Sequence, residues 1–303
     1  MSASDTIVAP AARPTPLALH LAVLLFGAFA CSTAVIFIKL STVPAVTLSA
    51  LRCLVAVAIL APLFWRDWRR HRATFGRREL LASVVPGLLL GLHFIAWIVG
   101  ARLTSSVNAS LIVNLIPIVM PFILFLLVRE RLTRWELAAT VVTLVGLGVL
   151  SVADFRLSRD YLVGDLICLV SMVLAALYLA LGRRNRALPS LWLYVVPLYL
   201  VAGVFCLGVA FACEEQPLRP YPGSEWLWIL ALGVIPTVLG HTCLNYAMKH
   251  LRGQVVSLVN MSQFVFAGIL AYFCFREIPD RSFYAASLFL IAGSAMAARP
   301  RPD

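Results

Sequence analysis

About ten apolar stretches of 18 residues or more are spread along the 303 residues of this chain, and each is long enough to cross a hydrocarbon core of about 30 Å. In lipid, an isolated apolar segment must satisfy its own backbone hydrogen bonds, which only a helix achieves. The composition agrees, because 13% of the residues are charged, about half the fraction typical of a soluble domain. The sequence therefore predicts an all-α, multi-pass membrane protein.

The predicted helices number ten, five in each half of the chain. They cover about residues 17–40, 44–65, 80–101, 105–128 and 133–152, then about 161–182, 189–212, 225–248, 254–275 and 281–298. The polar, proline-containing residues 1–16 are expected to form a mobile N-terminal tail, and residues 299–303 a C-terminal tail.

One unusual segment occurs twice, first from Val107 to Glu136 and again from Val255 to Ser282. Each copy has an asparagine midway along an apolar run and an Arg-Glu pair at its end. The echo predicts two homologous units, residues 17–152 and 161–298. Five helices per unit is an odd number, so the second unit enters the membrane from the other side. Such inverted repeats are typical of transporters.

The positive charges alternate between successive connections. Seventeen of the 25 lysines and arginines lie in one set of connections and tails: Arg13, residues 66–78, 129–134, 183–186, 249–252, Arg299 and Arg301. By the positive-inside rule this set is cytoplasmic, as are both termini. We therefore expect the cell inner (plasma) membrane. The net charge of +11 needs no nucleic-acid partner.

The cysteines and the short motifs exclude other classes of protein. None of the seven cysteines forms a C-x-x-C pair, so no metal or cofactor is predicted, and the thiols are expected to be free and buried. No H-E-x-x-H, G-x-S-x-G or G-x-x-x-x-G-K-[ST] occurs, which argues against a membrane-embedded enzyme and against an intrinsic nucleotide motor.

Several of these features resemble one known family. A proline-containing fourth helix is followed by Arg129 to Thr133 (RERLT), helix 1 ends in Lys39, and helix 2 carries Pro44 and Arg52. The chain resembles the drug/metabolite transporter superfamily in its ten-helix EamA-type branch, and within that branch it looks most like the YddG-type amino-acid exporters. The second copy departs from the pattern at Arg276 to Pro279. The resemblance implies a basket of two inverted repeats, with helices 3, 4, 8 and 9 lining a central cavity.

Polar side chains at helical spacing predict a pathway through the same helices. Polar groups in a bilayer must face protein or water, and ionisable ones are functional candidates by default. The candidates are His93, Trp97, Ser110, Asn114, Pro117, His241, Asn245, Tyr246, Ser257, Asn260 and Gln263, with Lys39, Arg52 and Tyr178 as further candidates. The alternative is hydrogen bonding between packed helices. Pro117 is expected to bend helix 4.

The charges inside the spans limit the solute. No Asp or Glu lies near the middle of a predicted helix, and Arg52 is the one truly interior cation. A small zwitterionic solute fits best, an amino acid with an aromatic or other apolar side chain, exported by alternating access. A drug or a nucleotide sugar or other organic anion is the alternative. Proton coupling through His93 or His241 stays open, as does the choice between monomer and homodimer.

Overall fold

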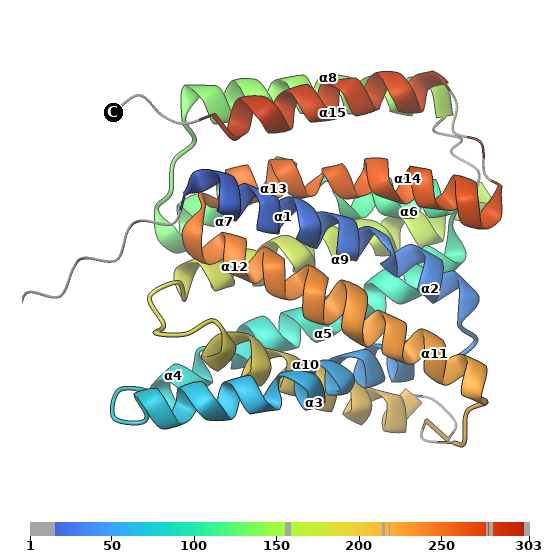
Figure 1. Ribbon diagram of the computed structural model, residues 1–303. Helices are drawn as coiled ribbons and strands as arrows, with labels where there is room; N and C mark the ends of the chain where they lie inside the picture. The colour runs from blue at the N-terminus through green and yellow to red at the C-terminus, as the bar shows by residue number, and fades with distance from the viewer. Residues whose placement is uncertain are drawn as a thin grey trace, which may run out of the picture.

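The computed structural model describes residues 16–154, 159–213, 216–217, 219–276, 278 and 281–299. Across these residues every regular element is a helix, which confirms the predicted all-α class. Figure 1 shows the helices lying side by side along one common direction. The predicted tail residues 1–15 and 300–303 lie outside the described residues, as does Glu277 of the second Arg-Glu pair.

The first half of the chain forms the predicted helices 1 to 5. They are α1 (Leu17–Ser32) with α2 (Ala34–Leu40), α3 (Ala45–His71), α4 (Arg77–Leu81) with α5 (Val84–Leu103), α6 (Ser106–Val113) with α7 (Ile116–Val128), and α8 (Arg134–Asp154). The main difference in length is α3, which continues past its predicted end to His71.

The second half forms the predicted helices 6 to 10. They are α9 (Arg159–Arg184), α10 (Trp192–Cys213), α11 (Gly223–Leu232) with the π-helix η1 (Gly233–His241) and α12 (Thr242–His250), α13 (Gly253–Asn260) with α14 (Ser262–Phe275), and α15 (Arg281–Ala297). The sequence did not predict the π-helix in the eighth segment, which is a rare element often found at functional sites.

The segments predicted as helices 4 and 9 are each broken at the centre. Asn114 caps the end of α6, and Asn260 is the last residue of α13. The fourth segment is therefore one candidate span, Asn108–Val128, made of two helices that meet just before Pro117. Pro117 lies in the first turn of α7, where its missing N–H has no helical acceptor to lose and costs little.

The two repeated segments also end alike. Arg129 closes α7 with φ 57° and ψ 24°, and Arg276 closes α14 with φ 58° and ψ 23°. The left-handed region is unfavourable for a side chain other than glycine. Two arginines in the same strained conformation, at matching points of two matching segments, are an independent sign of internal repetition.

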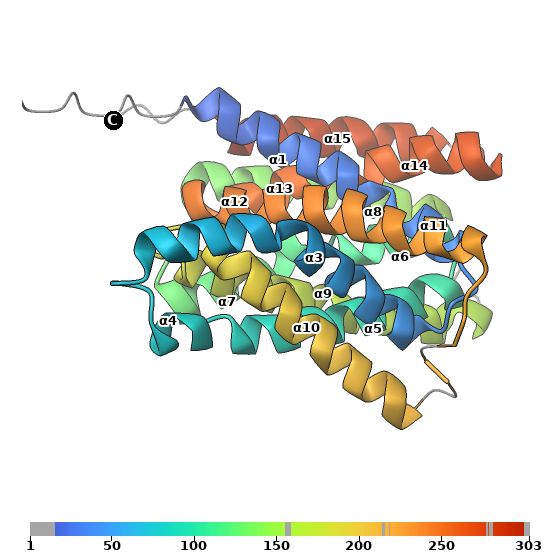
Figure 2. The same cartoon turned by 60° about the horizontal axis from the view of Figure 1, so that its bottom comes forward.

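The helices pack in pairs. α8 lies against α15 on one side of the molecule, and α3 lies against α10 on the other (Figure 1). Between these layers α5 packs on α9, α7 contacts α13, and α1 contacts η1 and α12. The view in Figure 2 shows the same layers, with α3 and α10 brought forward. The interior of the bundle is therefore enclosed by elements from both halves of the chain.

Eight helical stretches are long and apolar enough to cross a membrane by length and composition, among the described residues. They correspond to the predicted helices 1 to 4 and 6 to 9. The segments α8 and α15 are not among the eight. Large apolar side chains on the outer surfaces, such as Phe122, Leu126 and Leu288, are exposed, as expected where lipid replaces water.

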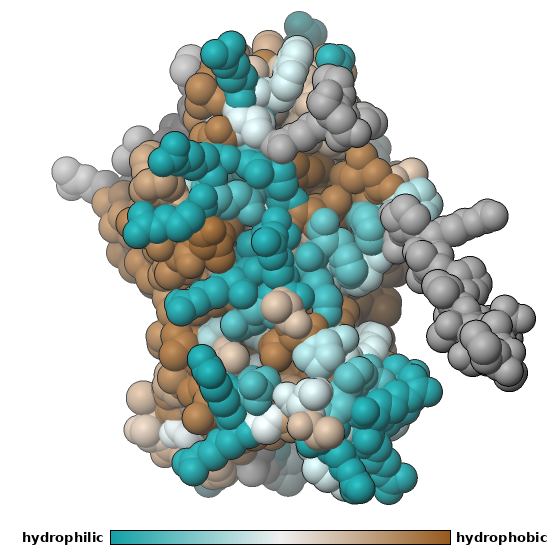
Figure 3. Space-filling model, turned by 90° about the vertical axis from the view of Figure 1, so that its left-hand side faces the viewer, coloured by the Kyte–Doolittle hydropathy of each residue, from teal (hydrophilic) through white to brown (hydrophobic). Residues whose placement is uncertain are grey.

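The basic connections lie at one end of the bundle, here called the basic end. The start of α1, the end of α15 and the connections α3–α4, α7–α8, α9–α10 and α12–α13 gather there, at the left of Figure 1. Figure 3 looks onto this end, where a band of hydrophilic residues runs between hydrophobic flanks. One polar end between apolar sides is the pattern of a protein that meets water at the membrane surface.

Candidate functional site

A small cavity with both polar and apolar side chains in its wall lies inside the bundle, with a volume of about 40 Å³. This is space for about two or three water molecules, because one water needs roughly 10–15 Å³ by this measure. Its walls come from seven of the ten predicted segments. The lining residues are Cys31, Ala34, Arg52, His93, Trp97, Val113, Asn114, Ile116, Ala175, Tyr178, Leu179, His241, Leu244, Asn260 and Gln263. The implied set of helices 3, 4, 8 and 9 was too small, since helices 1, 2 and 6 also contribute.

The guanidinium of Arg52 is completely buried in the cavity wall. Its Nε donates to Thr237 Oγ1 at 2.9 Å, and its Cζ lies 3.9 Å from the centre of the Phe94 ring. Among the described residues, neither Nη1 nor Nη2 has a hydrogen-bond partner, and both are buried. An arginine carries five N–H donors, so four of them here lack an acceptor. This is an uncompensated buried charge facing a cavity.

Two histidines lie beside each other in the wall, with ring centres 6.0 Å apart. Nδ1 of His93 is 2.9 Å from the carbonyl oxygen of Ser171. The hydroxyl of Ser171, which can donate or accept, lies 2.8 Å from the same nitrogen. Nδ1 of His241 is 2.6 Å from the hydroxyl of Tyr178. Both rings are therefore anchored through Nδ1 by side chains and backbone of α9.

The two asparagines of the repeated segments meet at the cavity. Asn260 donates to Asn114 Oδ1 at 3.4 Å, and Asn114 Nδ2 donates to the carbonyl of Ser110 at 2.7 Å. Gln263 in turn donates to Asn260 Oδ1. Where the two helices break, the amide side chains therefore form hydrogen bonds with backbone and side-chain groups. Discontinuous helices that meet near the middle of the membrane are typical of substrate and ion sites in transporters.

Close packing holds the π-helix against its neighbours. A Cβ added at Gly240 would lie 2.5 Å from Cys31 Sγ, so only glycine allows this approach of η1 to α1. Thr237 Oγ1 donates to the carbonyl of Leu232, and Asn245 Nδ2 donates to that of His241 at 2.8 Å. These bonds help to hold Thr237 against Arg52 and His241 in the cavity wall.

Eight of the fourteen sequence candidates line the cavity, and six do not. Ser110 and Asn245 take part only through the bonds just described, while Pro117 offers its carbonyl to Gln254 at 3.2 Å. The remaining three are Ser257, which donates to the Gln254 carbonyl, Tyr246, whose hydroxyl is 2.9 Å from His20, and Lys39, which donates to the Thr104 carbonyl. Tyr246 and Lys39 therefore lie apart from the cavity.

Sequence reasoning missed seven of the residues in the wall and two residues that hold its polar side chains. Cys31 and Ala34 form part of the wall, and Ser171 and Thr237 hold His93 and Arg52. Small or weakly polar side chains in apolar helices carry no signal that separates a wall from ordinary packing. All seven cysteines are free, but Cys213 and Cys274 are exposed and Cys243 is half-buried, so the expectation of buried thiols holds only for the other four.

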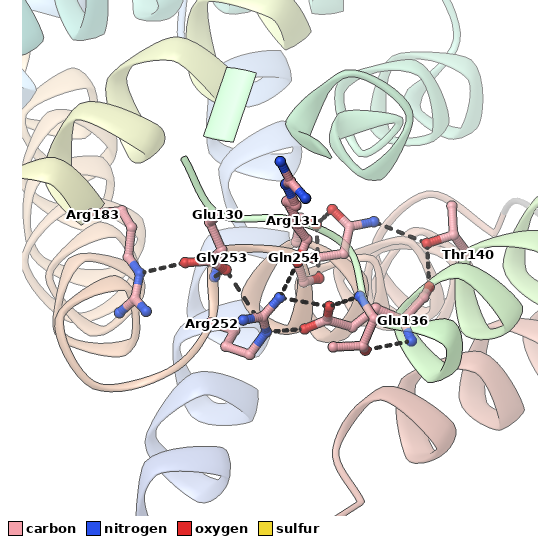
Figure 4. Close-up of polar contacts among 10 residues, drawn as sticks. Glu130, Arg131, Glu136, Thr140, Arg183, Arg252, Gly253 and Gln254 are labelled. Carbon is pink, nitrogen blue, oxygen red and sulfur yellow. Dashed lines mark hydrogen bonds and ion pairs between the residues drawn. The ribbon is translucent and has the colours of Figure 1, made fainter. Parts of the chain in front are cut away.

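An ionic cluster closes the basic end of the bundle (Figure 4). Glu130, next to the end of α7, accepts from Arg183 Nε at 3.0 Å and from the Gly253 N–H at 3.0 Å. Arg252 lies 3.9 Å from Glu130 and pairs closely with Glu136 at the start of α8. The hydrogen bond to Glu136 raises the pKa of Arg252. Four segments are thereby tied together beneath the cavity.

A second polar cluster closes the other end. Glu225, at the start of α11, accepts from Ser41 Oγ and Thr42 Oγ1 at 2.8 Å each and from the Thr42 N–H. This carboxylate is buried and joins the eighth segment to the turn between α2 and α3. The two clusters lie at opposite ends of the bundle, and α7 alone, with 13 residues, places about 20 Å between the cavity and the ionic cluster.

Comparison with known proteins gives one family and several distant relatives. The EamA-like transporter family matches residues 18–152 and, a second time, residues 162–299. The aromatic amino acid exporter YddG of Ancylobacter novellus is 26% identical, over 70% of this chain and 73% of its own. The human solute carrier family 35 member G1 is 25% identical, over 90% of this chain and 77% of its own. One crystal structure, 20% identical, superposes with a TM-score of 0.74 and covers 92% of this chain and 96% of the other, which supports the fold alone.

Proposed function

Since this chain belongs to the EamA-like transporter family, we propose that it exports amino acids with aromatic or other apolar side chains, or similar small metabolites. The family and its named relatives are transporters, so the chain is a multi-pass membrane transporter and not an enzyme. Its solute is a small molecule, and its surroundings are lipid. The observation that carries the proposal is the buried cavity at the meeting point of both halves of the chain.

We propose ten spans in two inverted five-helix units, residues 17–152 and 161–298, with both termini on the cytoplasmic side of the cell inner membrane. Two matches to one family, the pairing of α3 with α10 and of α8 with α15, and the like caps at Arg129 and Arg276 support this division. The positive charge gathered at the basic end supports its cytoplasmic orientation.

The mechanism proposed is alternating access. The cavity is far below the roughly 300–1,000 Å³ of typical small-molecule sites, and a polar cluster closes each end. These features suit the contracted state, between one that opens at the basic end and one that opens at the other. The breaks at Asn114 and Asn260 and the π-helix are places where segments can bend.

Solute flux in proteoliposomes containing this chain alone tests the proposal. Uptake of apolar amino acids by the vesicles is the expected result, and a lack of movement across a broad amino-acid panel would refute it. Asn114→Leu and Trp97→Ala should lower flux at normal protein levels, because both residues line the cavity. Equal losses of protein level and flux would assign them to packing instead. Uptake with and without an imposed pH gradient tests proton coupling.

A further inference from the structure

We propose that Arg52 is the carboxylate-binding group of the cavity, and that a carboxylate is the feature every transported solute must carry. The proposal rests on the transport function proposed above and adds the substrate class. Its starting point is a contradiction in the structure, a fully buried guanidinium with two nitrogens that find no acceptor.

The protein leaves this charge unpaired. Within the described residues no carboxylate lies among those lining the cavity, and Arg52 takes part in no ion pair there. A buried charge is normally paired with an opposite charge or fully hydrogen bonded. Here Thr237 accepts a hydrogen bond from Nε and from no other nitrogen of Arg52, while the Phe94 ring packs against the face of the guanidinium. The position of Arg52 is thus fixed, and its two outer nitrogens are the ones left for a ligand.

The fork of Nη1 and Nη2 matches a planar anion. A guanidinium binds a carboxylate through two parallel N–H···O bonds, which no neutral group reproduces. The half-helices α7 and α14 also begin at the cavity, beside Ile116 and Gln263. The N-terminus of a helix carries partial positive charge, so these elements add to the preference for an anion.

An ammonium group has weaker partners in the same cavity. It could be accepted by amide oxygens of Asn114 and Asn260 and by the C-terminal ends of α6 and α13. These carry partial charges, whereas Arg52 carries a full one. The site should therefore require the carboxylate and only tolerate the ammonium of an amino acid. Trp97 and Tyr178 provide the aromatic wall for an apolar side chain.

Three compounds with one side chain separate these groups: phenylalanine, 3-phenylpropionate and phenethylamine. Uptake of each, radiolabelled, is measured in proteoliposomes of the full chain. We expect transport of phenylalanine and 3-phenylpropionate but not of phenethylamine. Arg52→Gln should raise the KM for both carboxylates about tenfold to 100-fold, the loss expected for hydrogen bonds to a charged group. The exposed Arg72→Gln is the matched control and should leave KM unchanged.

Arg52→Lys covers the case in which Arg52→Gln fails to fold, since it keeps the charge but loses the planar fork. It should raise the KM for the carboxylates with a smaller effect on the maximal rate. Uptake of phenethylamine by the unaltered protein as efficient as that of the acids would overturn the proposal. So would Arg52 variants that lower the maximal rate for all compounds and keep their KM values, the mark of a structural role. No uptake of any compound by the unaltered protein, and none across the broad amino-acid panel, would instead refute amino-acid transport itself.

Discussion

Replacing Glu130 by glutamine should open the cavity towards the basic end. The Glu130 carboxylate accepts from Arg183 and from the Gly253 N–H, both at 3.0 Å, and its side chain is only 10% exposed. Glutamine keeps the size and one acceptor oxygen but removes the charge. The ties between the fourth segment, the sixth segment and the turn before α13 would then weaken, while the cavity itself is unchanged.

The size of the effect follows from these two bonds. Arg183 and Gly253 donate to different oxygens of Glu130, and glutamine has only one acceptor oxygen, so one of the two bonds is lost. A hydrogen bond to a charged group contributes about 1.5–3 kcal/mol, so the change weakens the closure by about 2 kcal/mol. Arg252, at 3.9 Å and partly exposed, adds little because solvent screens the pair. A difference of about 2 kcal/mol is a factor of about 30 in an equilibrium constant. The state open at the basic end should gain that factor in population.

Cys31 reports this opening, because its thiol lines the cavity. In a variant that keeps Cys31 as its one cysteine, the rate of modification by a small membrane-impermeant thiol reagent follows the open population. Inside-out vesicles present the proposed cytoplasmic side to the reagent. Glu130→Gln should speed modification about 30-fold there and leave right-side-out vesicles unchanged.

Glu225→Gln is the matched control at the other end. It removes the charge that Ser41 and Thr42 hold, and it should speed modification in right-side-out vesicles instead. Equal rates before and after the Glu130 change would refute the role of the ionic cluster in closure. If Glu130→Gln speeds modification in both vesicle orientations, the change loosens the whole bundle. The idea that each cluster closes its own end would then be refuted.

Three further changes test packing and the repeat. Gly240→Ala should lower the melting temperature in detergent, with about 1–3 kcal/mol of overpacking against Cys31; Gly208→Ala, with nothing within 4 Å, is its control. Arg129→Gly should preserve or raise the melting temperature, because it relieves about 1 kcal/mol of left-handed strain; a lower value would show that the arginine side chain contributes more than its backbone costs. Asn260→Leu should lower flux at normal protein level, as is expected of its counterpart Asn114→Leu, and unequal effects would argue against equivalent roles for the two asparagines.

The positions of the helices were predictable because a segment that crosses lipid must be a long apolar helix, which is visible in the sequence. The predicted ranges 189–212 and 281–298 differ from α10 and α15 by a few residues at most. The breaks at Asn114 and Met261 were not predicted, since an uninterrupted apolar run conceals a local change in hydrogen bonding. The π-helix had no visible signal for the same reason.

The cavity was predictable only in part, because helical spacing gives the face of a residue and not its partner. His93 and Trp97, four residues apart, do share the cavity wall. Tyr246 follows Asn245 by one residue and therefore points about 100° away around the helix, towards His20. Arg52 was recognised as interior, yet only the tertiary structure reveals its missing acceptor.

The proposed carboxylate site at Arg52 would also couple binding of a solute to closure of the cavity. It projects from α3, while the group that holds its Nε, Thr237, belongs to η1 in the other half of the chain. A ligand stabilises a conformation only through contacts that it makes better there than elsewhere. A carboxylate bound to Nη1 and Nη2 would supply the missing opposite charge, and in this structure the amides of Asn114 and Asn260 line the same cavity. Bound solute should therefore favour the contracted state. Release then requires one closure to yield, the ionic cluster or the Glu225 contacts, and the two differ in chemistry, so each side of the membrane can be controlled separately.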